Sequence, residues 1–600
     1  MLLQRLVEYA DSGGEVVPPF HERKPVRWVL DLDSDGRPVR ELTDQAEPGD
    51  RDRRFGVPRL VPKVSRTMGI SPALAVDNPE YVLGWVGEGG DASRVPRQHE
   101  AFRDLTLQWA VEEPDDPVAA AAAAFYRRGG HATVSQPEKW GRGDLIALRV
   151  GGVFACETPS ARRFWAQVAG GRKGLGRTGL CLVHGGIGPL LKTMPQQVER
   201  RWLPGASNSA ALVSINEAVH GYELQKFLGN TPICVDCGLK FMSGLTSLLS
   251  SPRHSVLLPG QNSRLVWWLT GGRDDDIMAM VDTPDEVQVR HVLAGVASGE
   301  VAGLDEAYFC STTVAGNVAR VVVRDWLELP LARVYRNILA WHRDHEIVDG
   351  WSGQVIRVGL PQLVRVTGRW QAGRGGAPGS WVKLGGSGED RPSDAYRGLM
   401  RAALLSVPLP PRLSAHVIHR VRADGRIDAP RVALLRLALR RRPSTTNPEV
   451  YTPMLNPDNR DPAYVSGRIF AALEAVQESF AYISKQNLNT TFADRHLARA
   501  ITSPRTAIIA GRRAANAWVK RIRRTNPGMA HIHQQRLDEL FDLLDGPDRL
   551  PAVAVLRQQE AFVVGYHHQR AAINAERAAR AAVGGREDQS SDTDLEGDAA

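Results

Sequence analysis

The stretch YVSGRIFAALEAVQESFAYI, residues 464–483, decides the fold class of the C-terminal part of this chain. Apolar residues recur in it every three or four positions without a proline, which is typical of an α-helix packed against other helices. The same spacing returns in four further segments, at residues 396–405, 430–441, 505–524 and 534–546. We therefore expect a helical connector over residues 395–453 and an α-helical bundle over residues 454–583.

The segment between the connector and the bundle is rich in proline. It reads RPSTTNPEVYTPMLNPDNRDP, residues 442–462, and closely spaced prolines end helices and mark a domain boundary. Upstream, residues 370–394 consist mostly of Gly, Ser, Pro and charged residues, which predicts a flexible loop or linker. Downstream, residues 584–600 are acidic and polar, which predicts a disordered tail.

The N-terminal and central parts mix helical segments with short strands. Apolar and polar residues alternate on both sides of Asp35-Gly36 in the stretch VRWVLDLDSDGRPVRELT, residues 26–43, which predicts a β-hairpin. Short β-rich runs follow, namely LCLVHGG (180–186), ALVSIN (211–216), RLVWWLT (264–270) and ARVVVRDWLEL (319–329). This irregular order favours an α+β fold with short sheets over repeated β–α–β units. We expect an N-terminal region over residues 1–170 and a central region over residues 171–394.

The composition is that of a globular protein with a basic bias. The chain has 600 residues, 43% of them hydrophobic, and a net charge of +8, and 65 of its 75 basic residues are Arg. Either a GC-rich genome or contact with phosphates explains the arginine bias. The opening MLLQRLVEYADSGGE is interrupted by Arg5 and Glu8, and no apolar run approaches the ~18 residues of a membrane span. With five sparse cysteines, we expect a soluble protein of the reducing cytoplasm, without a membrane partner.

Basic residues cluster at two places. Residues 495–524 contain nine Lys and Arg and no acid, with Asn516 and Trp518 among them. A solvated helix face usually mixes charges of both signs, so a face of one sign indicates an anionic partner such as nucleic acid. A second cluster runs from Arg420 to Arg442, and we expect it to contribute nucleic-acid contact as well.

Three smaller motifs have competing interpretations. Cys234 and Cys237 form a single CxxC. A zinc site would need Cys181 and His184 as further ligands, about fifty residues upstream. We therefore expect buried thiols at a helix start, with zinc binding and redox chemistry as the alternatives. Asp274, Asp275 and Asp276 lie at a turn, where a solvated tip competes with a Mg²⁺ site. The pairs His531/His533 and His567/His568 lack nearby ligand partners and are expected at the surface. No catalytic group and no cofactor is expected.

Several segments together resemble a known family. They are MLLQRLVEYAD with the following hairpin; RTMGI (66–70), VDN (76–78) and EYVLG (80–84); LCLVHGGIGPLL (180–191) with PGASNSAALVSIN (204–216); RLVWWLT with AGNVARVVVRDWLE (315–328); YVSGRIFAALEAVQE; and QEAFVVGYHHQR (559–570). In this order they resemble the large subunit of the type I-C CRISPR Cascade surveillance complex.

The resemblance implies a non-enzymatic subunit with many partners. Such a subunit assembles with guide-RNA-binding backbone subunits and a guide-processing subunit, recognises the protospacer-adjacent motif on duplex DNA, promotes R-loop formation, holds the displaced strand and recruits a helicase-nuclease. It also implies a small subunit made from an internal start, for which Met454 is placed at the proline-rich boundary. The N-terminal region is then the candidate for motif recognition.

We assign DNA contact to four groups of residues. Lys63, Arg66, Thr67 and Asn78 lie in N-terminal loops, Asn208 and Ser209 in the central Gly/Ser/Asn turn, and Asn317 and Arg320 before a strand. The fourth group lies in the first basic cluster and consists of Arg512, Arg513, Trp518, Lys520, Arg521, Arg523 and Arg524. The alternatives are a stand-alone Mg²⁺-dependent nuclease using Asp274–Asp276, or a structural scaffold whose arginines reflect only the genome.

Overall fold

The computed structural model divides the chain into two compact units, which we describe separately. Unit 1 comprises residues 1–257, 263–273 and 308–328, and unit 2 comprises residues 258–262, 274–307 and 329–600. The structure describes all residues except 13–17, 19, 48, 50–54, 65–68, 259, 272, 274, 284–305, 374–376, 489, 545–548 and 594–600, and it describes no side chains for 172–175 and 582–593.

The predicted α+β class is confirmed. Helix accounts for 48% and strand for 17% of the chain, the sheets are short, and the C-terminal region is helical. None of the described helices is both long and apolar enough to cross a membrane. The finer division predicted at residues 171, 395 and 454 stays a prediction.

Unit 1 contains most of the strands. Its helices and strands are α1 (Leu2–Asp11), β1 (His21–Val26), β2 (Trp28–Leu32), β3 (Thr43–Asp44), β4 (Val57–Pro62), β5 (Val76–Asp77), α2 (Pro79–Val82), α3 (Val95–Glu112), α4 (Pro117–Arg127), β6 (Ile146–Val150), β7 (Val153–Phe154), α5 (Pro159–Lys173), β8 (Gly174–Leu180), β9 (Ile187–Leu191), β10 (Ala206–Ala211), α6 (Val235–Ser250), β11 (Ser255–Leu258), β12 (Ser263–Leu269) and β13 (Tyr308–Pro330).

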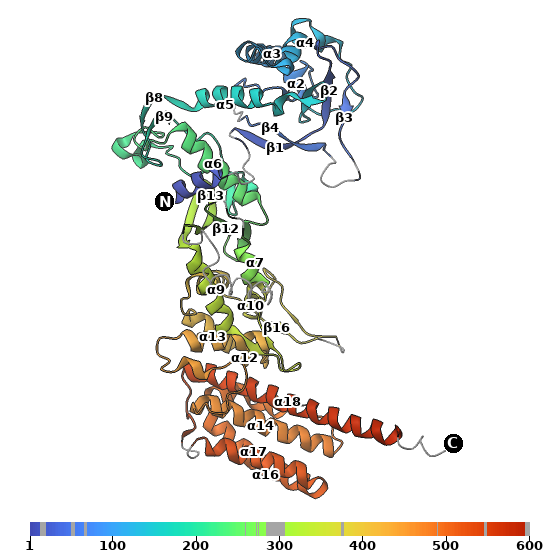
Figure 1. Cartoon of the computed structure of the whole chain (residues 1–600), viewed down its shortest axis with the longest axis vertical. Helices are drawn as coiled ribbons and strands as arrows, with labels where there is room; N and C mark the ends of the chain where they lie inside the picture. Colours follow the sequence, from blue (N-terminus) through green and yellow to red (C-terminus); the bar gives the residue numbers. More distant parts are fainter. Residues whose placement is uncertain are drawn as a thin grey trace, which may run out of the picture. The chain divides into compact units, whose positions relative to one another are not determined.

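The predicted hairpin builds the first sheet of unit 1. Strand β2 is buried along its whole length and lies between β3, which is antiparallel to it, and β6, which is parallel. The turn that follows β2 requires a glycine, because Gly36 has φ +74° and a Cβ there would lie 2.2 Å from the carbonyl oxygen of Ala121 on α4. The turn therefore also seats α4 against the sheet (Figure 1).

The second sheet of unit 1 has the strand order β10-β13-β12-β11. Strands β12 and β13 are antiparallel, with Trp268 opposite Cys310, and both residues belong to a buried core that also contains residues of α1 and α6. Strand β10 runs parallel to β13 on the other side. This confirms the two β-rich runs predicted at residues 264–270 and 319–329.

The run LCLVHGG is not a strand, contrary to the sequence prediction. Strand β8 ends at Leu180 and β9 begins at Ile187, so the run forms the turn between two antiparallel strands. Backbone N–H groups of Cys181 and Gly185 donate to the carbonyls of Gly186 and Cys181, each over 2.9 Å, and Gly185 has φ +75°. Consecutive glycines favour such a turn over a continued strand.

Unit 2 is dominated by helices. Its helices and strands are α7 (Ile277–Asp282), α9 (Leu331–His345), β14 (Ile347–Val348), β15 (Val355–Ile356), α10 (Leu360–Val366), β16 (Trp370–Gln371), β17 (Ser380–Trp381), α11 (Ala395–Leu405), α12 (Pro411–Asp424), α13 (Ala429–Arg441), α14 (Pro462–Ile483), α15 (Phe492–Thr502), α16 (Pro504–Thr525), α17 (Pro527–Asp542) and α18 (Leu556–Thr593).

Helix α14, which contains the stretch YVSGRIFAALEAVQESFAYI, is the buried centre of the C-terminal bundle. It starts where the proline-rich stretch ends, because Asp461 accepts hydrogen bonds from the N–H groups of Ala463 and Tyr464 while Pro462 takes the first helical position. Glycines let α14 approach α18 closely: a Cβ on Gly467 would lie 1.9 Å from the carbonyl oxygen of Phe562. Figure 1 shows α14, α16, α17 and α18 together in this part of the chain.

Helix α18 extends beyond the residue at which the sequence predicts the disordered tail to begin. The tail was predicted over residues 584–600, whereas the helix runs to Thr593. Residues 594–600 lie outside the described residues.

Candidate nucleic-acid interface

Helix α16 separates an apolar face from a cationic one. Ile508, Ala515, Val519 and Ile522 follow the helical repeat and are buried against the bundle. Next to this face, beginning about 20° from Val519, five exposed basic residues fall within an arc of about 120° at about 100° of rotation per residue. They are Arg512, Arg513, Lys520, Arg523 and Arg524, which we call the α16 cationic face.

The charges of this face are not neutralised within the described part of the chain. Arg512 packs over the ring of Phe541, with 4.2 Å from guanidinium carbon to ring centroid, but none of the five residues forms an ion pair there. Arginines of α18 behave differently, because Arg570 and Arg577 pair with Glu478 at 2.8 and 2.9 Å. A face of one sign repels itself, and an anionic ligand relieves that repulsion.

Two predicted residues of the cluster lie outside the cationic face: at the same rotation per residue, Arg521 lies about 60° beyond Arg524, and Trp518 lies about 180° from the centre of the arc. Trp518 is half-buried, and its ring meets Phe492 edge-on, with centroids 6.4 Å apart. Arg521 is exposed, with its guanidinium 5.7 Å from the ring of Phe480. On α15, Arg495 and Arg499 are also exposed. They belong to the first basic cluster but are not among its predicted DNA-contact residues.

The second basic cluster, residues 420–442, contributes mainly to the interior of unit 2 and not to an exposed binding surface. Arg420, Arg431 and Arg436 are buried, with at most 6% of each exposed. Arg431 donates to Asp424 and to the backbone oxygens of Val366 and Gly368, and Arg442 pairs with the fully buried Glu560. These four side chains hold the fold together, which corrects the expectation of nucleic-acid contact for them, whereas Arg422 and Arg426 of the same cluster are exposed.

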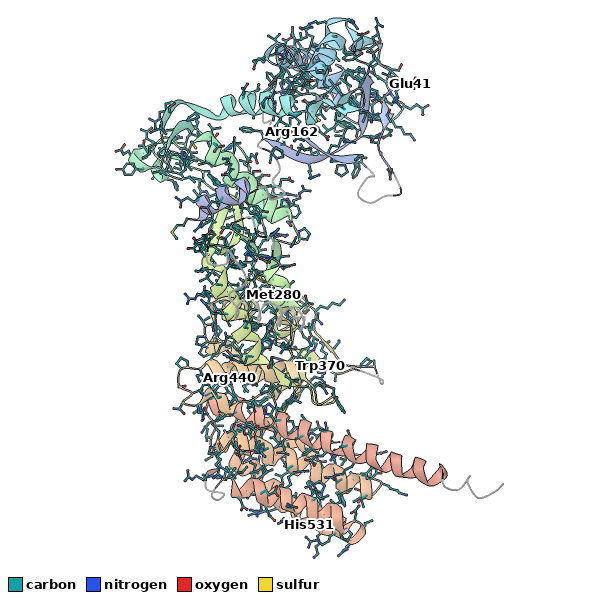
Figure 2. The ribbon with its side chains drawn as sticks, viewed as in Figure 1. Glu41, Arg162, Met280, Trp370, Arg440 and His531 are labelled. Carbon is teal, nitrogen blue, oxygen red and sulfur yellow. The ribbon has the colours of Figure 1, made fainter. Side chains whose placement is uncertain are left out.

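Arg440, labelled in Figure 2, shows why the sequence could not reveal this. It pairs with Asp344 at 3.1 Å, and Arg441 binds the other oxygen of the same carboxylate at 2.8 Å. Asp344 lies in α9, far away in the sequence. Burial disfavours its ionised form, but the two arginines outweigh that effect and lower its pKa.

The structure brings two other predicted groups together at one edge of the second sheet in unit 1. Strands β10 and β13 pair at Ala206 with Val318 and at Ala211 with Arg320, so Asn208 and Ser209 lie between these paired positions. Asn208, Asn317 and Arg320 are exposed, and Ser209 is half-buried. The edge thus gathers amide, hydroxyl and guanidinium groups, which suit phosphate or base-edge contact.

The N-terminal candidates have internal roles. Lys63 donates from Nζ to the carbonyl of Gln197 over 3.2 Å and lines a cavity with Phe20 and Trp165. The side chain of Asn78 caps α2 by accepting from the N–H of Tyr81 over 3.2 Å. Arg66 and Thr67 lie outside the described residues.

In the acidic triplet, one carboxylate has a structural role. Asp274 lies outside the described residues, and Asp276 caps α7 by accepting from the N–H of Ala279 over 3.0 Å.

His531, labelled in Figure 2, is exposed as predicted. His533, His567 and His568 are buried, which corrects the surface prediction. Burial lowers the pKa of His533 to about 4, and its Nε2 lies 2.9 Å from the hydroxyl of Ser479.

A family comparison adds to this geometry. Residues 3–574 match the family model described as CRISPR-associated protein (Cas_Csd1). The match includes α16 and the β10–β13 edge, whereas no curated protein matches the chain. The resemblance noted in the sequence is confirmed at the level of this family. Since the match covers nearly the whole sequence, the chain belongs to the CRISPR-associated protein (Cas_Csd1) family.

Proposed function

We propose that this chain is the non-catalytic large subunit of a type I-C Cascade surveillance complex. It recognises the protospacer-adjacent motif on target duplex DNA, promotes R-loop formation, holds the displaced strand and recruits the helicase-nuclease. The observation that carries the proposal is the α16 cationic face, which stays without ion-pair partners among the described residues, in a chain of a CRISPR-associated family.

The physics of guided recognition supports this role. In such complexes base pairing with the guide RNA supplies sequence specificity, so the protein needs only a short base-specific contact and a charged surface for the backbone. Single strands are held by cationic grooves with aromatic side chains. The α16 cationic face suits the displaced strand, and the β10–β13 edge with Asn208, Asn317 and Arg320 suits duplex recognition.

Co-purification tests the proposal. The tagged full chain is expressed with the other subunits of its locus and a guide RNA, purified, and assayed with labelled duplexes that carry a matched target and randomised flanking bases. We expect a stoichiometric guide RNA, repeated backbone subunits, and DNA binding that depends on the flank. The flank dependence should weaken in Asn317→Ala/Arg320→Ala, because these side chains lie at the edge that we assign to duplex recognition. Both side chains are exposed, so their loss leaves the core intact.

Two results would contradict the proposal. One is purification of the chain without guide RNA or partner subunits. The other is Mg²⁺-dependent cleavage of DNA by the chain alone that disappears in Asp275→Ala, which would instead establish the stand-alone nuclease.

We further propose that Met454 is an internal start that yields a separate small subunit. Its side chain is exposed in the proline-rich stretch, ahead of the capping residue Asp461, so a product from Met454 retains α14 to α18. We expect Met454→Leu to remove a short C-terminal product from the purified complex, as seen by mass spectrometry. Met529→Leu is the matched control, because a start there would discard α16. Persistence of the short product in Met454→Leu would exclude this start.

A further inference from the structure

Four potential metal ligands converge in unit 1, outside the candidate nucleic-acid interface. Cys181 and His184 lie in the turn between β8 and β9, Cys234 is the N-cap of α6, and Cys237 lies in its first turn. Their ligand atoms all lie within 4.8 Å of one another. Nδ1 of His184 is 3.2 Å from Sγ of Cys237 and 3.7 Å from Sγ of Cys234.

These distances are close to those around one tetrahedral ion. With Zn–S bonds of about 2.3 Å and Zn–N bonds of about 2.0 Å, ligand atoms at the corners of a tetrahedron lie about 3.5 to 3.8 Å apart. The two ligand pairs have the form Cys-x-x-His and Cys-x-x-Cys, the short spacing of structural zinc sites. All three cysteines are free and buried, so no disulfide accounts for their approach.

Backbone N–H groups donate to two of the three sulfurs. The N–H groups of Val183 and Cys234 donate to Sγ of Cys181 over 3.4 and 3.3 Å, and the N–H of Cys237 donates to Sγ of Cys234 over 3.4 Å. Such donors around a metal site stabilise the negative charge of the ligands and orient them. Three mutually close sulfurs with these donors are poorly explained by apolar packing alone.

Glycines shape the turn around the histidine. A Cβ on Gly186 would lie 2.7 Å from Nε2 of His184, and a Cβ on Gly188 would lie 3.2 Å from Cβ of Cys234. Both positions therefore favour glycine if the imidazole is to reach the cysteines. His184 is exposed, which gives an ion access to the cluster from solvent, and it also lines a cavity with Met1, Arg5 and Glu8.

We propose that Cys181, His184, Cys234 and Cys237 bind one structural Zn²⁺ ion. Three thiolates and an imidazole are the soft and borderline ligands that select zinc, and four protein ligands leave no open position for a reacting water. The ion ties the β8–β9 turn to the start of α6. Because α6 packs on α1, β9 and β12, the ion stabilises the part of unit 1 that carries the second sheet.

Elemental analysis of the purified full chain tests the site. We expect about one zinc per chain by inductively coupled plasma mass spectrometry, released when an organomercurial modifies the thiols. Chain produced with cobalt should show the visible bands of tetrahedral Co²⁺ and thiolate-to-cobalt charge transfer. Cys234→Ser/Cys237→Ser should lose the metal, and His184→Cys should retain it because a thiolate replaces the imidazole.

The matched control uses the two remaining cysteines. Cys156→Ser/Cys310→Ser changes the same number of buried thiols and should keep one zinc per chain. Wild-type chain without zinc and with all five thiols reactive after unfolding would overturn the proposal, and so would a Cys234–Cys237 disulfide in protein purified without reductant. Retention of zinc in Cys234→Ser/Cys237→Ser would overturn it too. The wild-type measurements decide the question even where a variant fails to fold.

Discussion

Replacing Arg513, Arg523 and Arg524 by alanine is expected to weaken binding of single-stranded DNA by about 10- to 100-fold at low salt. All three side chains are exposed on α16 and have no ion-pair partner among the described residues, so their loss removes phosphate contacts without disturbing the core. Each lost contact should lower the slope of log affinity against log salt by about 0.7, which gives a change of about 2 for the triple variant. Fluorescence anisotropy with a labelled oligonucleotide over a salt series measures both quantities.

The matched control removes the same number of positive charges at other positions of unit 2. Arg333 and Arg336 on α9 and Arg422 on α12 are likewise exposed and without ion-pair partners among the described residues. Arg333→Ala/Arg336→Ala/Arg422→Ala should bind DNA almost as the wild type does. If both triple variants weaken binding equally, net charge and not the α16 cationic face is responsible, and the interface would be wrongly placed.

Arg436→Met is expected to destabilise unit 2 by about 3–5 kcal/mol. Only 1% of this side chain is exposed. Its guanidinium donates to the carbonyls of Tyr451 and Thr452 over 2.8 and 3.0 Å, and to those of Arg343 and Glu346 over 2.8 and 2.9 Å. It therefore joins α13 to the proline-rich stretch and satisfies carbonyls at the C-terminal end of α9, where a helix has no internal donors left.

Methionine replaces the aliphatic stem of the arginine but has no guanidinium, so those four carbonyls lose their donor. Urea unfolding followed by tryptophan fluorescence measures the loss, with Trp341, fully buried in α9, as a reporter close to the site. Arg422→Met, at an exposed position of α12, should stay within about 0.5 kcal/mol of the wild type. Similar stability of the two variants would show that the buried guanidinium is dispensable.

The contrast between Arg436 and Arg523 shows the limit of a sequence reading. Both lie in basic, helical segments, although the segment around Arg436 also contains Asp424 and Asp428. The acids and carbonyls that neutralise the second cluster come from Asp344, Asp390 and Glu560 and from the backbone of α9. A local count of charges includes Asp424, which pairs with Arg431, but it cannot find partners such as Asp344 and Glu560, which lie about one hundred residues away in the chain.

Local patterns were enough where the cause is local. Helical spacing identified α14 and α16, the Asp-Gly turn identified the first hairpin, and the acid-free run at residues 495–524 identified the α16 cationic face. The apolar residues of LCLVHGG predict a strand, whereas Gly185 and Gly186 belong to the turn that follows β8.

The sequence by itself determined the α+β class, the helical C-terminal part and the CRISPR-associated family, because periodicity, turn residues and family segments are local patterns of the sequence. Only the tertiary structure decided which arginines are free for an anion, which polar loops meet at the β10–β13 edge, and that Cys181 and His184 reach Cys234 and Cys237. Those outcomes depend on long-range packing, which sets burial and brings ligands together across about fifty residues of chain.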